Sequence, residues 1–151
     1  MTPADEAKRL SILLEMGVPV AREAIRWAEA QIATAESPSN ELLELSTAPA
    51  SQPATVLSHL HVLAAGADFW RAFGAAMPRL REYLVDHPSA SERVAAAFYR
   101  IAVAAGDVPE EFTFAYRFED SFQLARVGIS GRTEDVHQDF MDELRQFPQR
   151  S

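Results

Sequence analysis

Apolar residues recur at helical spacing along most of this 151-residue chain. Between residues 20 and 36, Val20, Ala24, Ala28, Ile32 and Ala35 follow the three- and four-residue steps of one helix face. Similar stripes occur within residues 56–64 and 69–84. The pattern predicts an all-α fold, a single-domain bundle of seven to eight short helices over residues 1–151.

Start and stop signals refine this prediction. Thr2, followed by Pro3 and Asp5, is typical of a capped helix start. The run Ser89 to Glu92 matches a capping box ahead of a helix that ends near residue 105. Pro78 is expected to kink or restart the helix that contains it, because proline has no N–H to donate.

Residues 111–129 allow two interpretations. Strict alternation indicates a strand, and four aromatic residues alternate here: Phe112, Phe114, Tyr116 and Phe118. A helix would instead align Phe114, Phe118, Phe122 and Ala125 on one face. The second half of the segment alternates poorly and the intervening turn has no glycine, so we expect a helix. A β-hairpin at about residues 111–129 is the alternative.

Composition supports the helical prediction and removes several kinds of chemistry. The chain contains 26 alanines, 6 glycines and no cysteine. Alanine has the highest helix propensity, and without cysteine there is no disulfide, thiol nucleophile or cysteine–zinc site. The N-terminus lacks the apolar stretch of a signal peptide, and no apolar run approaches the roughly 18 residues of a membrane span. We therefore expect a soluble, cytoplasmic protein that contacts no membrane.

Charge is distributed unevenly. The net charge is −8, and residues 107–143 contain ten acids and three arginines, a balance of −7. Residues 71–100 contain five arginines and three acids, a balance of +2. Nucleic-acid binding needs a basic surface, so we expect none.

The acidic segment is predicted to meet a basic protein partner, because complementary charge speeds encounter and orients the partner. The predicted contact residues are the following acids: Glu110, Glu111, Glu119, Asp120, Asp135, Asp139, Asp142 and Glu143. Trp27, at the edge of its helix stripe, is a further candidate anchor. The same charges could serve solubility alone, or the +2 segment of a second copy could face the acidic segment.

Metal and catalytic motifs are incomplete. Glu134 and His137 match one half of the Glu-x-x-His pattern of di-iron bundles, and they are the weak candidates for a metal site. No second half exists, because His59, His61 and His87 lack a glutamate three residues earlier. His59 and His61 are expected on opposite flanks of their helix, and His87 at a helix end. We expect no metal and no cofactor.

No catalytic residue can be assigned from the sequence. Gly-Ile-Ser-Gly at residues 128–131 lacks the second glycine of a nucleophile elbow, and no phosphate-binding glycine motif occurs. We expect a non-enzymatic protein. Acids and histidines can still meet across helices, so a helical ligand-binding protein or enzyme with an aromatic pocket stays an alternative.

In size, acidity and helical character the chain resembles small bacterial immunity and antitoxin proteins. The resemblance implies an interaction protein that masks a basic enzyme.

Overall fold

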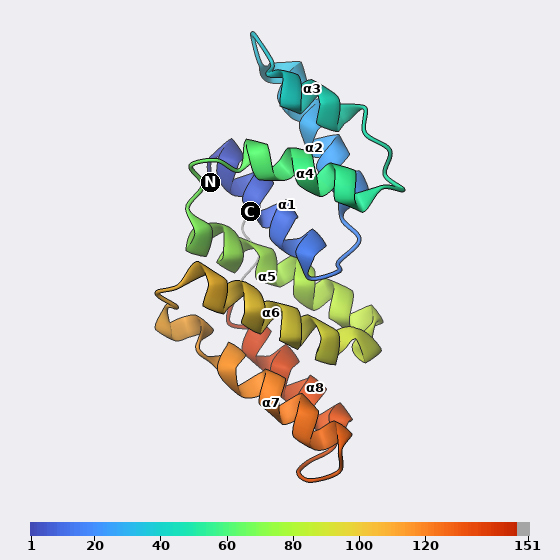
Figure 1. The fold of residues 1–151 in the computed structure, drawn as a ribbon, viewed down its shortest axis with the longest axis vertical. Helices are drawn as coiled ribbons and strands as arrows, with labels where there is room; N and C mark the ends of the chain where they lie inside the picture. Colours follow the sequence, from blue (N-terminus) through green and yellow to red (C-terminus); the bar gives the residue numbers. More distant parts are fainter. Residues whose placement is uncertain (148–151) are drawn as a thin grey trace. The chain divides into compact units, whose positions relative to one another are not determined.

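Eight α-helices and two 3₁₀ turns make up the regular structure of residues 1–147, the part of the chain that the computed structural model describes (Figure 1). These residues contain no strand. The predicted all-α fold is confirmed, with eight helices in the described part, and the alternative of a β-hairpin at about residues 111–129 is not supported.

The chain divides into two compact units, an N-terminal unit, Met1–Ala76, and a C-terminal unit, from Met77 onward. The division falls inside α5 (Phe69–Asp86). Helix α5 is not restarted at Pro78, which lies within it. That the whole chain is a single domain stays a prediction.

The N-terminal unit contains α1 (Pro3–Glu15), α2 (Ala21–Thr34), α3 (Asn40–Ser46) and α4 (Pro53–Leu63). Helix α1 packs on α4, and α2, α3 and α4 pack on one another. The most deeply buried large side chains of these four helices are aliphatic: Leu10, Ile12, Leu13, Leu45, Val56 and Leu60. Burying such side chains is the main favourable term in folding, so these residues hold the four helices together.

A buried carboxylate joins the start of α1 to the start of α5. Thr2 caps α1 as predicted, and the side chain of Asp5 accepts a hydrogen bond from the Thr2 backbone N–H in return. Asp5 is 1% exposed, accepts a 2.7 Å hydrogen bond from the backbone N–H of Asp68, and lies 3.6 Å from Arg71. The Asp68 and Thr2 hydrogen bonds hold the pKa of Asp5 below its ordinary value.

The C-terminal unit contains α6 (Ser91–Ala105), α7 (Phe114–Arg126) and α8 (Thr133–Leu144), with η1 (Pro88–Ala90) and η2 (Glu110–Phe112) before α6 and α7. Helix α7 packs on both α6 and α8, and α6 also contacts α8. Its core is rich in phenylalanine: Phe98, Phe112, Phe114, Phe118, Phe122 and Phe140.

Burial explains why residues 114–126 form a helix. Phe114, Phe118 and Phe122 are 8%, 2% and 1% exposed, whereas Tyr116 is 46% exposed. A strand would place Tyr116 on the same face as Phe114 and Phe118. Helical spacing instead turns Tyr116 outward and brings Phe118 and Phe122 to within 5.2 and 6.3 Å of the Phe140 ring, measured between centroids.

The predicted capping box at Ser89 is wrong. The chain already turns helically in η1, so Ala90 is the residue before α6 and no side chain caps that helix. An N-cap residue needs a non-helical backbone, which Ser89 lacks inside η1. Ser91 is buried and hydrogen-bonds to His137 on α8 instead.

No helix within residues 1–147 has both the length and the apolar character that crossing a bilayer requires.

Candidate functional site

Most of the predicted acidic contact residues lie exposed on η2, α7 and α8. Glu110, Glu111, Asp120, Asp135, Asp139 and Asp142 are exposed, and Glu119 and Glu143 are half-buried. We call these eight residues the acidic surface. Asp135, Asp139 and Asp142 follow one another at four- and three-residue steps and so share one side of α8.

Two ion pairs use part of this charge. Glu143 pairs with Arg117 across α7 and α8 at 2.9 Å, and Asp142 pairs with Arg145 on its own helix at 2.7 Å. Among the residues the structure describes, five exposed acids of this surface form no ion pair: Glu110, Glu111, Asp120, Asp135 and Asp139. These five carboxylates are therefore left without a cation from the described chain.

The Arg117–Glu143 pair joins α7 to α8 at one level along the two helices. Helices α7 and α8 run antiparallel beside each other (Figure 1). Asp120 lies one turn after Arg117 on α7, and Asp139 lies one turn before Glu143 on α8. Because the two helices are antiparallel, these two carboxylates lie at the same level along the helix pair. The backbone carbonyl of Glu111 accepts a 3.4 Å hydrogen bond from Gln146, which brings η2 to the far end of α8.

Trp27 lies on α2 in the N-terminal unit and is half-buried. A half-buried tryptophan fits a core-edge residue as well as an interface anchor, so its role in binding stays a prediction.

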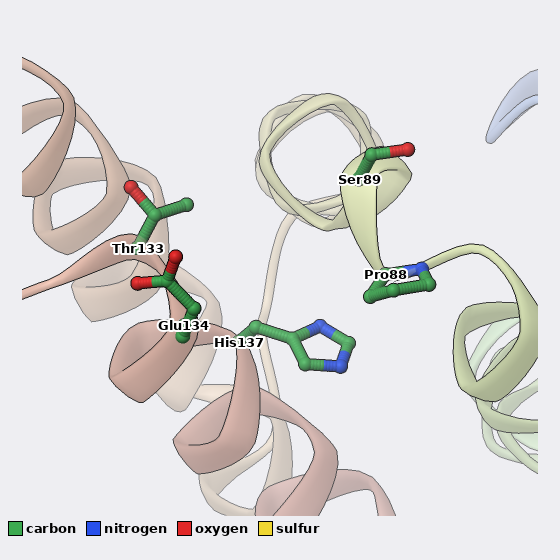
Figure 2. A pocket seen from close by; sticks show the side chains of 5 residues that line it. All are labelled: Pro88, Ser89, Thr133, Glu134 and His137. Atoms are coloured by element: carbon green, nitrogen blue, oxygen red, sulfur yellow. The ribbon is translucent and has the colours of Figure 1, made fainter.

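The weak metal candidates Glu134 and His137 point in different directions. The imidazole of His137 is directed toward the η1 turn, while the carboxylate of Glu134 points away from it (Figure 2). Glu134 pairs with Arg132 at 3.7 Å, and both side chains are largely exposed. The two side chains therefore do not converge as ligands of one ion.

A pocket of about 220 Å³ opens beside His137, lined by Pro88, Ser89, Thr133, Glu134 and His137 (Figure 2). It is not the predicted aromatic pocket, since no aromatic ring other than the imidazole lines it. On its inner side Nδ1 of His137 is hydrogen-bonded to the hydroxyl of Ser91. Burial lowers the pKa of His137, because desolvation disfavours the charged imidazolium.

Ser91 and His137 resemble a nucleophile and base only in composition. Ser91 is 1% exposed, so its oxygen is closed to a substrate. A catalytic pair needs an accessible nucleophile. The hydrogen bond instead connects the first turn of α6 to α8.

The remaining histidines lie at helix edges, as predicted. His59 and His61 leave α4 on different sides, and each meets glutamate from another helix: His61 Nε2 lies 2.8 Å from Glu15 on α1. Nδ1 of His87 lies 3.0 Å from the carbonyl oxygen of Tyr83 at the end of α5, where it caps the helix.

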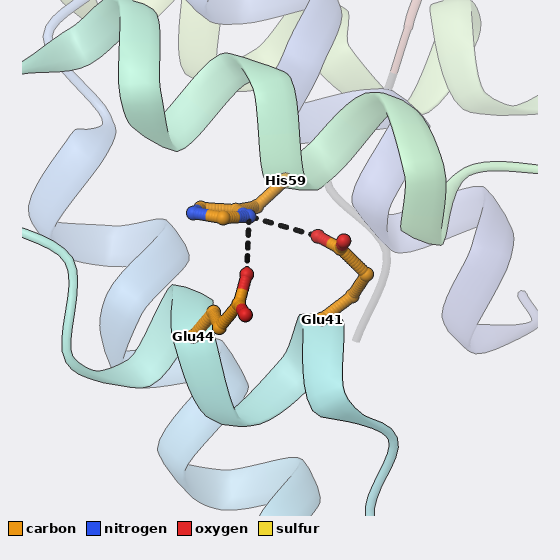
Figure 3. Close-up of side chains that lie close together, drawn as sticks. All are labelled: Glu41, Glu44 and His59. Carbon is orange, nitrogen blue, oxygen red and sulfur yellow. Dashed lines mark hydrogen bonds and ion pairs between the residues drawn. The ribbon is translucent and has the colours of Figure 1, made fainter.

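His59 meets two glutamates at once. Its Nδ1 lies 2.8 Å from Glu41 Oε2 and 3.7 Å from Glu44 Oε2, and both glutamates come from α3 (Figure 3). The three ligand-type atoms lie within 4.8 Å of one another, the one such group of three or more found in the described residues. Sequence reasoning missed it, because it looked for Glu-x-x-His on one helix and these residues come from two.

No family model, no curated protein and no solved structure matches the chain. Functional inference therefore depends on the residues themselves.

Proposed function

We propose that this protein is a non-enzymatic, cytoplasmic interaction module whose acidic surface binds a basic protein partner, in the manner of an immunity protein or antitoxin. The observation that carries the proposal is the set of five exposed carboxylates of the acidic surface without an ion pair in the described chain: Glu110, Glu111, Asp120, Asp135 and Asp139. A carboxylate already paired within the chain attracts a basic partner weakly, whereas these five are not neutralised by a described residue.

Repulsion within the surface supports the same proposal. Like charges at adjacent positions of a helix face destabilise it by a few tenths of a kcal/mol per pair. A basic partner removes this repulsion and gains attraction from the same carboxylates. Complementary charge raises association rates and fixes orientation more than it raises affinity, so binding is expected to be fast and sensitive to salt.

The proposal favours a different protein over a second copy of this chain. In the segment of residues 71–100, Arg71 lies 3.6 Å from both Asp5 and Asp68, and Arg79 and Arg93 also have partners. Three of its five arginines are therefore already engaged within the chain, which leaves Arg81 and Arg100 to meet the acidic surface of another copy. Self-association is the outcome to look for if no other partner is captured.

Affinity capture with a surface of reduced negative charge tests the proposal. The variant changes four of the five unpaired acids, Glu110→Gln, Asp120→Asn, Asp135→Asn and Asp139→Asn, and so changes the net charge by four, from −8 to −4. We expect wild type to capture a basic protein from lysate of its own cells at low salt, and the variant to lose that protein. High salt should release it.

A matched control distinguishes an effect of the acidic surface from an effect of net charge alone. Glu29, Glu36, Glu82 and Asp86 are exposed and form no ion pair within residues 1–147, and their amides also give −4. The control variant should keep the partner. If both variants retain every captured protein, the acidic surface is not the binding site; a wild-type dimer that dissociates with salt would support self-association instead.

A further inference from the structure

The cluster of Glu41, Glu44 and His59 begins with the way α3 is oriented. Ser39 Oγ accepts a 3.2 Å hydrogen bond from the backbone N–H of Leu42, which starts the helix at a defined residue. Leu42 and Leu45 are 8% and 0% exposed, so this face of α3 is turned inward. Glu41 and Glu44, three residues apart, then lie together at the edge of the buried face.

The matching edge of α4 supplies His59. Val56 and Leu60 on α4 are fully buried, and His59 lies beside them with a side chain 19% exposed. Since α3 packs on α4, the two edges meet. Figure 3 shows both carboxylates directed at the same ring nitrogen, while the other nitrogen points away from them.

A hydrogen bond explains only half of this arrangement. An N–H at Nδ1 can donate to Glu41 at 2.8 Å, but the 3.7 Å separation from Glu44 is too long for a second hydrogen bond. Glu44 therefore adds a second negative charge to the cluster without a hydrogen bond from the ring. A divalent cation between the three atoms would offset both carboxylates.

The distances suit a small cation. In a tetrahedral site with metal–ligand distances of about 2.0–2.1 Å, neighbouring ligand atoms are about 3.3 Å apart. The observed 2.8 and 3.7 Å lie on either side of this value. Each of these two nitrogen–oxygen distances would have to change by about half an ångström to match the spacing of neighbouring ligands.

We propose that Glu41, Glu44 and His59 form a binding site for a divalent transition-metal ion of the Zn²⁺ class. One imidazole and two carboxylates are a donor set for Zn²⁺, whereas Mg²⁺ and Ca²⁺ prefer oxygen ligands alone. The three ligands leave a fourth position for water. The Glu44 side chain is 61% exposed, so the ion would enter directly from solvent and exchange readily.

The bound ion would join α3 to α4. Helix α3 has only seven residues, so it depends on contacts with its neighbours rather than on its own propensity. A ligand that binds only the folded state raises its stability. The site lies entirely within the N-terminal unit and is independent of the acidic surface, so either proposal can fail without the other.

Titration calorimetry on protein freed of metal with EDTA tests the site, using Zn²⁺, Mg²⁺ and Ca²⁺ as separate probes. We expect one Zn²⁺ per chain, no binding of Mg²⁺ or Ca²⁺ at the same concentrations, and a melting temperature raised by about 5 °C with Zn²⁺ in large excess over its dissociation constant. A Zn²⁺-dependent shift of the His59 Nδ1 resonance in a ¹⁵N spectrum would identify Nδ1 as the ring nitrogen that binds the metal.

Glu44→Gln is the decisive variant, because it removes a predicted ligand and leaves the Glu41–His59 hydrogen bond in place. We expect Zn²⁺ affinity to fall more than about tenfold in Glu44→Gln and in His59→Gln, since losing a ligand costs more than losing an outer-shell partner. Circular dichroism checks that each variant is folded. Because Glu44 is exposed, its variant stays informative even if His59→Gln unfolds.

The chain offers its own control in His61 and Glu15, a histidine–glutamate pair 2.8 Å apart in which no second carboxylate from residues 1–147 meets the ring nitrogen. His61→Gln should leave Zn²⁺ binding unchanged. The proposal is overturned if Zn²⁺ does not bind, if Glu44→Gln binds it as tightly as wild type, or if His61→Gln abolishes binding.

Discussion

Helices α1 to α4 and helices α6 to α8 bury different kinds of side chain. The fully buried large residues of α1 to α4 are aliphatic, whereas six phenylalanines are buried between Phe98 and Phe140. The fully buried Phe73, on the α5 part of the N-terminal unit, lies outside this comparison. Side chains cap two of the first four helices, α1 and α3, through Thr2 and Ser39. No side chain caps α2, α4, α6, α7 or α8.

The comparison shows two ways to specify helices. In the N-terminal unit, local hydrogen bonds define where α1 and α3 begin, and the aliphatic stripes then bury them. In the C-terminal unit, where no start of α6, α7 or α8 has a side-chain cap, contacts between aromatic rings hold these three helices together. Most helical stability comes from such packing.

The largest expected effect follows from truncating the centre of the phenylalanine core. Phe140 is fully buried, and its ring centroid lies within 6.4 Å of those of Phe98, Phe114, Phe118 and Phe122. Phe140→Ala should lower the free energy of unfolding by about 3–5 kcal/mol, measured by urea denaturation, since it leaves a cavity. Leu60→Ala, the aliphatic counterpart, should cost about 2–5 kcal/mol. A loss below about 1 kcal/mol for Phe140→Ala would contradict the proposed role of the rings.

The next effect concerns the buried carboxylate of the N-terminal unit. Asp5→Asn should lower the urea midpoint, because the amide carries no charge and accepts the Asp68 and Thr2 hydrogen bonds less strongly. The pKa of Asp5 is lowered in the folded protein, so its contribution is present above the unfolded value of 3.8 and is lost as pH falls through the folded value.

Stability measured from neutral pH to below pH 3.8 checks this sign. Wild type should lose more stability over that range than Asp5→Asn, and the exposed Glu36→Gln should follow wild type. Parallel curves for wild type and Asp5→Asn would contradict the depressed pKa.

A smaller effect is expected at His137. His137→Ala removes the partner of the buried Ser91 hydroxyl, which should cost about 1–3 kcal/mol at pH 8. Burial lowers the pKa of His137, so the unfolded state takes up the proton first as pH falls below 6.5, and stability falls until the folded pKa is passed. Wild type should show this loss between pH 8 and pH 5, and His137→Ala should not. His61→Gln, at an exposed histidine, should keep it.

The smallest effect is expected on the acidic surface. The four-site amide variant at Glu110, Asp120, Asp135 and Asp139 should change the free energy of unfolding by no more than about 0.5 kcal/mol per site, and the sum should be neutral or stabilising at low salt. The reason is that these exposed groups form no ion pair within the described residues. Thermal unfolding of the variant and of wild type at low and high salt measures this change in stability. A variant that no longer folds would show that these acids stabilise the fold rather than bind a partner.

Periodicity predicted the helices because burial of one face is a local property of the sequence. The Phe114, Phe118 and Phe122 stripe predicted α7, and Tyr116 lies exposed as helical spacing requires. The same spacing placed Asp135, Asp139 and Asp142 on an exposed side of α8. The Ser89 capping box was wrong because the proline-led 3₁₀ turn that precedes α6 depends on backbone geometry that the motif does not report.

Periodicity and composition therefore establish which face of each helix is apolar and where charge accumulates. Which helix edges meet depends on the packing of the helices: Glu41 with His59, Asp5 with Asp68, and Ser91 with His137, pairs separated by 18, 63 and 46 residues. A helical pattern predicts the direction in which a side chain leaves the axis of its own helix, but it does not predict which other helix that side chain will meet. The partner is chosen when the apolar stripes of all the helices pack together, and polar residues at the stripe edges then meet as a consequence.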